Sequence, residues 1–489
     1  MIKPKYSSAL DIKLPIIPGF YPDPSIVRVG DTYYIANSSF EYAPGVPIHS
    51  SQNLIDWKFE GHSLPTRAQV NLDGMGNSQG IFAPTLRHHD GKFFMITTCV
   101  DGGWQLIVTA DSASGPWSDA VRVDVFGIDP DLAWGEDGTC YMTHASLPLN
   151  GIGQVEIDTA TGALLSEPKL VWRGTGGKFP EGPHLYKIKD YWYMLIAEGG
   201  TERGHAVTIA RSKKIDGPFE AAPGEPLLSN RSTDFAIQNT GHADFVQRPD
   251  ASWAMVFHGT RPKGSSPEWH IIGRETCAVE IEWRDGWPVL GAPIEPATAA
   301  PVLEILDANS DLPAEWIAPG SWPNELATKT GAGIEFTGFI GRRQTSQHFV
   351  LRAKLEGESG FGVQVRIDNR HTLSLIKRGQ ACVAVWQIGD HVFDIGSAEV
   401  ADQPFEFKVE SIAMSGGFHA PVGPDKLVLS AVFGDGREVQ IAELDGRYLS
   451  TEVAGGMTGR IIGIVADTSA TLTNWRYESS AETPAATHA

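Results

Sequence analysis

The sequence has 489 residues, with 39 Lys and Arg against 59 Asp and Glu, and a formal net charge of −20. Such an acidic surface repels phosphate backbones and anionic membranes, which argues against nucleic acid or a membrane as a partner. The many turn formers and aromatics (53 Gly, 32 Pro, 14 Trp, 11 Tyr and 21 Phe) argue against a coiled coil, a helical bundle or a disordered chain. The length suggests about two to four domains.

The cysteines and the N-terminus indicate a cytoplasmic protein. The four cysteines are widely scattered without metal-ligand spacing, which favours free buried thiols in a reducing compartment (Cys99, Cys140, Cys277 and Cys382). The first residues, MIKPKYSSALDIKLPII, contain no continuous apolar core and no cleavage site of a secretory signal. No apolar run is long enough to span a membrane.

One short pattern recurs five times in the first 290 residues. Each copy has a polar turn pair, an aromatic-rich segment and a closing Ile or Met, at Ile35, Met95, Met142, Met194 and Met255. The turn pairs predict hairpins, and a period near 50 residues is typical of propeller blades. A β-sandwich with coincidental hairpins is the weaker alternative. We therefore expect a five-bladed β-propeller over residues 1–290.

Residues at equivalent places in these repeats would converge on the propeller axis. Twelve or thirteen positions before each closing residue lie Asp23, Ala83, Asp129, Glu181 and His242. An isolated acid most often caps a turn, and an isolated histidine is most often structural. Three acids in equivalent places instead favour a functional ring, where the pKa values of neighbouring carboxyls are pushed apart.

This ring matches the chemistry of glycosidic bond hydrolysis. One protonated and one ionised carboxyl group are what such a reaction needs. Phe40 and Phe82 lie between the hairpins, where they could face the apolar side of a sugar, although each alone is more often a core residue. Arg274 could bind sugar hydroxyls or pair with an acid, and a surface salt bridge is its plainer interpretation.

The chain resembles glycoside hydrolase family 43, and most closely its β-xylosidases and α-L-arabinofuranosidases. The motifs are PGFYPDPSIVRVGDTYYIANSSFEYAPGVPIHSSQNLIDW, GIFAPTLRHHDGKF, GIDPDLAW, FPEGPHLYKI, AEGGTERGHAVTIARS, NTGHADFVQ and GRET, which follow in order over residues 18–276. Jointly they are highly specific, whereas any one would be weak. The resemblance implies a five-bladed propeller with an inverting mechanism.

The resemblance also implies roles for the candidate residues. Asp23 would be the general base, Glu181 the general acid, and Asp129 would orient Glu181 and raise its pKa. The positions of His242, Arg274 and Phe40 match those that line the family's sugar pocket. The residue before Ala83 is Phe82, where the family often has Trp, which leaves the sugar preference open. The resemblance also leaves open a calcium or sodium ion near the axis, close to His242, although we find no dedicated acidic loop that would bind one. We expect that no cofactor is required.

The rest of the chain predicts a second all-β domain. Residues 291–301 form a Pro- and Ala-rich linker, and residues 302–479 carry period-2 strands typical of a jelly-roll-like β-sandwich. This domain could wall the pocket, form a subunit contact in a homo-oligomer, or simply stabilise its partner. Residues 480–489 are expected to be a disordered tail.

We therefore predict an inverting exo-hydrolase that releases terminal β-D-xylose from small xylo-oligosaccharides. The alternatives are an α-L-arabinofuranosidase and a non-catalytic sugar-binding propeller, which would not need three acids. A retaining, fructosidase-like enzyme is a further alternative, but Pro22 stands where its Asn-Asp-Pro motif has Asn. Xylose and arabinofuranose differ by too few pocket atoms for the sequence to choose between them.

Overall fold

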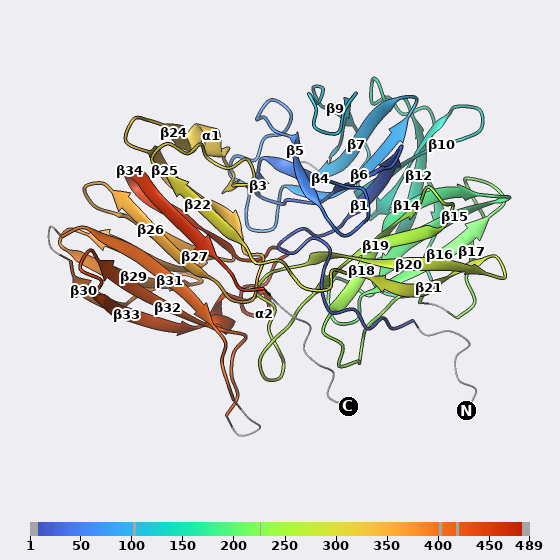
Figure 1. The fold of residues 1–489 in the computed structure, drawn as a ribbon. Helices are drawn as coiled ribbons and strands as arrows, with labels where there is room; N and C mark the ends of the chain where they lie inside the picture. The colour runs from blue at the N-terminus through green and yellow to red at the C-terminus, as the bar shows by residue number, and fades with distance from the viewer. Residues whose placement is uncertain (1–7, 101–103, 225, 401–402, 417–419, 482–489) are drawn as a thin grey trace. The chain divides into compact units, whose positions relative to one another are not determined.

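The computed structural model describes residues 8–100, 104–224, 226–400, 403–416 and 420–481, and its regular structure is almost entirely β (Figure 1). It divides into two compact units. The propeller unit comprises residues 1–260 and 274–296, and the sandwich unit comprises residues 261–273 and 297–489. Residues 482–489 of the expected tail lie outside the described residues. The predicted all-β class, a five-bladed propeller followed by a sandwich, is confirmed.

The propeller unit contains five antiparallel sheets of four strands each, and these are its blades. Blades 1 and 2 contain β1 (Ser25–Val29), β2 (Thr32–Ala36), β4 (Gly45–Ser51) and β5 (Lys58–Leu64), then β6 (Ile81–His89), β7 (Lys92–Cys99), β8 (Trp104–Ala110) and β9 (Val121–Val123). Blade 3 contains β10 (Ile128–Trp134), β11 (Cys140–Ser146), β12 (Gly151–Ile157) and β13 (Lys169–Trp172). Blades 4 and 5 contain β14 (Glu181–Ile188), β15 (Tyr191–Glu198), β16 (Ala206–Ser212) and β17 (Glu220–Ala221), then β18 (Gln238–Gln247), β19 (Trp253–Thr260), β20 (Glu275–Arg284) and β21 (Trp287–Ile294). A short strand, β3 (Tyr42–Ala43), precedes β4.

The predicted hairpins join the first two strands of the blades. In blade 2, His89 pairs with Lys92 across Asp90 and Gly91, whose φ values of 47° and 79° are those of the mirror-image turn that suits a twisted hairpin. The five closing residues of the repeat are all fully buried, at 0% exposure (Ile35, Met95, Met142, Met194 and Met255). The repeat therefore marks where each blade packs against its neighbours.

The sandwich unit contains one hydrogen-bonded sheet of 12 strands. Its long strand β34 (Ile461–Glu478) pairs with β27 through its first half and with β26 through its second half, so the sheet turns a corner there. The core includes Trp316 and Trp475, whose ring centroids lie 4.8 Å apart. The other strands of this sheet are β22 (Leu303–Asp307), β24 (Ala327–Lys329), β25 (Ile334–Arg343), β26 (Val350–Glu356), β27 (Phe361–Arg366), β28 (His371–Arg378), β29 (Ala381–Ile388), β30 (His391–Glu399), β31 (Phe405–Ile412), β32 (Lys426–Phe433) and β33 (Glu438–Asp445). The remaining short elements are β23 (Ala318–Pro319), α1 (Pro323–Leu326), η1 (Gly446–Leu449) and α2 (Thr451–Ala454).

All four cysteines are buried and free of disulfides, as the sequence predicts. Across the described residues, we find no helix that is both long enough and apolar enough to cross a bilayer.

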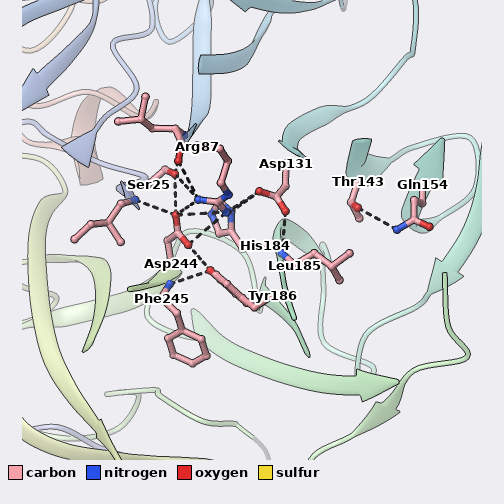
Figure 2. A network of polar contacts seen from close by, with 12 residues as sticks. Ser25, Arg87, Asp131, Thr143, Gln154, His184, Leu185, Tyr186, Asp244 and Phe245 are labelled. Atoms are coloured by element: carbon pink, nitrogen blue, oxygen red, sulfur yellow. Dashed lines mark hydrogen bonds and ion pairs between the residues drawn. The ribbon is translucent and has the colours of Figure 1, made fainter. Parts of the chain in front are cut away.

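A buried polar network joins all five blades at the propeller axis. Figure 2 shows the guanidinium group of Arg87, from β6, between the carboxylates of Asp131 and Asp244, from β10 and β18, at 2.7 and 2.8 Å. The ring of His184, from β14, lies 2.9 Å from Arg87, and Ser25 of β1 donates to Asp244. Both carboxylates have no exposed side-chain surface. One cation is therefore shared by two buried anions contributed by different blades.

The same network fixes neighbouring blades through their backbones. The Ser25 hydroxyl accepts the backbone N–H of Leu86, and Asp131 accepts that of Leu185. Asp244 accepts that of Ile26, which closes the ring between the last blade and the first. Burial alone would raise the pKa of Asp244, but Arg87, His184 and the hydrogen bonds from the Arg87 and Tyr186 side chains lower it to about 2. Asp244 is therefore ionised over the whole neutral range.

Replacing Arg87 by methionine is expected to destabilise the propeller strongly. The substitution leaves Asp131 and Asp244 buried without a cation, which costs about 3–5 kcal/mol and lowers the midpoint of thermal unfolding by roughly 10 °C. Arg284→Met is the matched control, because Arg284 pairs with Glu282 on the surface and its loss changes the midpoint by less than about 2 °C. Equal midpoints for the two variants would show that the axial network does not hold the blades together.

Candidate active site

Each blade places one residue near the propeller axis, shortly before the residue that the blade contributes to the axial network. In four blades this residue has a left-handed backbone, with φ of 52° at Asp23, 55° at Asp129, 56° at Gly182 and 50° at His242. In blades 3, 4 and 5 it lies in a β-bulge, where the strand register shifts. Bulges re-aim side chains and are frequent at functional sites. The structure therefore brings Asp23, Asp129 and His242 together as the sequence predicts.

Glu181 does not occupy the equivalent position in blade 4, and this corrects the repeat alignment. The Leu185 N–H that binds Asp131 corresponds to the Ile26 N–H that binds Asp244. The residue three positions before Leu185 is Gly182, and the residue three positions before Ile26 is Asp23. Gly182 is therefore the blade 4 equivalent of Asp23, and Glu181 precedes it by one residue. The reason is that Glu181 pairs regularly with Ala197 before the bulge begins. Because it starts β14, its carboxyl group still lies at the same end of the blade.

Asp23 lies in a pocket of hydrogen-bond donors. Arg274 and Ser38 donate to its two carboxylate oxygens, Ser38 at 2.6 Å. Nδ1 of His258 lies 3.0 Å and Nδ1 of His242 3.5 Å from Oδ1. Burial alone would raise the pKa of Asp23, but Arg274, His242 and His258 together hold it well below its ordinary value. Asp23 is therefore a carboxylate over the whole neutral range.

Burial keeps the two histidines beside Asp23 uncharged, whereas Asp23 itself is ionised. Burial lowers the pKa of His242 to about 3 and that of His258 to about 4, although the negative charge of Asp23 opposes the change in both. Both rings are therefore neutral at pH 7. The positive charge that balances Asp23 comes from Arg274.

Asp129 and Glu181 form a pair of carboxyl groups that resist ionisation. Burial and the negative charge of Asp23 raise the pKa of Glu181 to about 7. Burial and Glu181 raise that of Asp129 well above its ordinary value, although the Gly182 N–H donates to it at 3.1 Å. The two groups titrate as a unit, and together they retain a proton near neutral pH. The site thus holds one ionised and one protonated carboxyl function.

Aromatic residues and Arg274 lie beside the carboxyl groups. The rings of Phe40 and Phe82 are 5.2 Å apart, and the Arg274 guanidinium lies 5.6 Å from the centre of the Phe40 ring. Phe40 and Ala83 are buried, whereas Phe82 is partly exposed. The backbone of Phe40 pairs with Ile81, which fixes it against blade 2. These residues therefore form an apolar wall next to Asp23.

The sequence analysis missed several residues of the site. His258 and Ser38 contact Asp23 directly, yet they come from the second strand of blade 5 and the segment after the second strand of blade 1. The axial residues Ser25, Asp131 and Asp244 lie two residues after Asp23, Asp129 and His242. That alternation was a usable signal, because every second residue of a strand points to the same side.

The described residues include one group with metal-binding donors: Asp23, His242 and His258, whose donor atoms lie within 4.8 Å of one another. This group fits calcium or sodium poorly, because hard cations prefer six or more oxygen ligands and the group offers one carboxylate and two imidazoles. Arg274 also occupies the same Asp23 oxygen with its own positive charge. The mechanism proposed below involves no metal ion.

Comparison with known proteins identifies the family. Residues 12–288 match glycosyl hydrolases family 43. The chain is 39% identical to a xylan 1,3-beta-xylosidase of a Vibrio species over 62% of this chain and 60% of that protein's length. It is 35% identical to a non-reducing end alpha-L-arabinofuranosidase of Bacteroides ovatus over 92% of this chain and 90% of the relative.

A solved structure covers both units. The xylan beta-1,4-xylosidase from Bacillus halodurans matches 96% of this chain and 100% of its own, with a TM-score of 0.86 and 28% identity. The chain belongs to glycosyl hydrolase family 43, as its motifs indicate.

The elevated pKa of Glu181 can be measured directly. In protein with ¹³C-labelled glutamate carboxyl groups, we expect one signal that titrates near pH 7 and is absent from Glu181→Gln, while exposed glutamates titrate near their ordinary value. In Asp23→Asn the Glu181 signal should titrate at lower pH, because the negative charge of Asp23 contributes to its raised pKa and an amide carries none. A Glu181 signal that titrates near pH 4 would contradict the assignment of a protonated group.

Proposed function

We propose that the protein is an inverting exo-glycoside hydrolase that releases terminal β-D-xylose from small xylo-oligosaccharides. The observation that carries this proposal is the opposite electrostatic tuning of two carboxyl groups in one buried ring. The pKa of Asp23 is held low by Arg274 and the histidines, whereas that of Glu181 is raised to about 7. General base and general acid catalysis need these two protonation states at the same pH.

The proposed reaction is a single displacement. Asp23 removes a proton from a water molecule while the water oxygen bonds to the anomeric carbon. The bond from that carbon to the glycosidic oxygen breaks, and Glu181 gives its proton to the departing oxygen. Burial and the charge of Asp23 keep Glu181 protonated until this step, and Asp129, which accepts the Gly182 N–H, titrates together with it. The products are the free pentose with inverted configuration and the shortened saccharide.

The apolar wall supports a sugar ring in front of Asp23. Phe82 offers ring surface to the C–H groups of a pentose, Phe40 packs beside it, and Arg274 lies next to Phe40. The relatives' names include both β-xylosidase and α-L-arabinofuranosidase. An α-L-arabinofuranosidase is therefore the second candidate, and it would use the same carboxyl groups. The cytoplasmic location remains an expectation from the sequence.

The first test of this proposal uses paired substrates and product analysis. We expect hydrolysis of nitrophenyl β-D-xyloside to exceed that of nitrophenyl α-L-arabinofuranoside, and proton NMR of the first product from the xyloside to show the α anomer. The reverse preference would select the second candidate without altering the mechanism. A β-xylose product would disprove the single displacement, and no hydrolysis of either substrate would favour a sugar-binding protein.

The second test separates the roles of the two carboxyl groups. Glu181→Ala removes the proton donor, so it should reduce kcat on xylobiose by about 10²–10⁴-fold and affect a dinitrophenyl xyloside far less, because dinitrophenolate leaves without protonation. Asp23→Ala removes the activation of water, which both substrates need, so both should lose a similar factor. If Glu181→Ala impaired both substrates equally, the acid would have to be sought at Asp129.

A further inference from the structure

The segment that leads into Glu181 is held by a buried carboxylate outside the ring. Glu198, at the end of β15, has 2% exposure and accepts hydrogen bonds from the backbone N–H of Thr175 at 3.0 Å and of Gly177 at 3.0 Å. The hydroxyls of Thr175 and Thr208 donate to its other oxygen at 2.7 and 2.8 Å. We call residues 174–180 the acid loop. Its first half is therefore fixed to blade 4.

This anchored loop presents an aromatic side chain to solvent. Phe179 is 65% exposed, although the loop around it is held in place. Its φ of 49° lies in the left-handed region, which a bulky residue adopts only under constraint. One edge of its ring packs on Gly200, where an added Cβ would lie 3.3 Å from the ring atom Cδ2. The remaining surface of the ring is open.

The left-handed backbone of Phe179 is the feature that points to a function. Such strain at a bulky residue lowers stability, and it clusters at active sites and ligand clamps. The ring lies two residues before Glu181 in the chain. The oxygen that Glu181 protonates leaves with the sugar on the reducing side of the broken bond, so that sugar has to lie beside Glu181.

We propose that Phe179 is the apolar platform for the sugar on the leaving-group side of the scissile bond. This inference rests on the proposed hydrolase function and adds a second sugar subsite to the one in front of Asp23. The ring would contact the C–H face of a xylose unit. Glu198 would hold the acid loop in place, so that the distance between Phe179 and Glu181 stays constant. Substrates with a sugar leaving group would gain from the contact, and substrates without one would not.

The experiment compares Phe179→Ala with the wild-type protein on two substrates. Xylobiose fills the leaving-group side, whereas β-D-xylosyl fluoride has no sugar there. We expect kcat/KM on xylobiose to fall about three- to ten-fold, mainly through KM, and kcat/KM on the fluoride to change by less than about two-fold. Phe179→Tyr should recover most of the loss, because it keeps the ring.

The matched control is Leu165→Ala. Leu165 is 60% exposed and lies between β12 and β13, at the end of blade 3 opposite to Glu181, so both substrates should keep their rates. A loss with Phe179→Ala that is equal on xylobiose and on the fluoride, or no loss on xylobiose, would overturn the assignment of the platform.

A binding measurement separates this inference from the proposed function. In the Glu181→Gln protein, calorimetry should show that Phe179→Ala weakens xylobiose several-fold and leaves xylose unchanged. This result does not depend on turnover. If the wild-type protein hydrolysed neither substrate, the hydrolase proposal would fail while calorimetry still decided the role of Phe179. If Phe179→Ala left xylobiose affinity unchanged, the platform would be rejected whatever the activity.

Discussion

The sharing of one guanidinium group between two buried carboxylates is the constraint on which the propeller depends. Arg87 lies between Asp131 and Asp244, each of which also accepts a backbone N–H from the next blade. A buried ion pair adds little stability over apolar packing, but loss of one partner is costly, so such a group enforces one arrangement. Here the arrangement is the position of five blades around one axis. Asp23 and Asp129 lie two positions before the network residues Ser25 and Asp131, and Glu181 lies three positions before His184.

This placement explains how carboxyl groups in one ring can have opposite protonation states. Arg87 pairs with Asp131 and Asp244 of the network, so the charge states of the ring residues are governed by their own immediate neighbours. Asp23 has the donors of Arg274 and Ser38, whereas Asp129 and Glu181 have each other and a single backbone donor. All three groups are buried, yet Asp23 is ionised while Asp129 and Glu181 retain a proton, because their neighbours differ.

Much of the fold was predictable because the propeller repeats itself in sequence. A turn pair such as Asp90-Gly91 encodes its hairpin locally, and the buried closing residues encode the packing of each blade. Residues that depend on contacts between blades were not predictable. Arg87 follows no repeat spacing, and His258 approaches Asp23 only when β19 pairs with β18. Phe179 carries no local signal either, because neither its exposure nor its left-handed φ can be inferred from the residues around it in the sequence.

The offset of Glu181 from the ring position has a steric reason. A Cβ at Gly182 would lie 2.9 Å from Nε2 of His242, and the other ring atoms of that histidine are nearly as close. His242 in turn lies 3.5 Å from Asp23, so a side chain at position 182 would push on the group beside the base. Blade 4 therefore has a glycine, Gly182, where the backbone is left-handed. Its carboxyl group comes one residue earlier, from Glu181 in the regular part of the strand. There Glu181 lies directly after the acid loop, which Glu198 holds through the backbone N–H groups of Thr175 and Gly177.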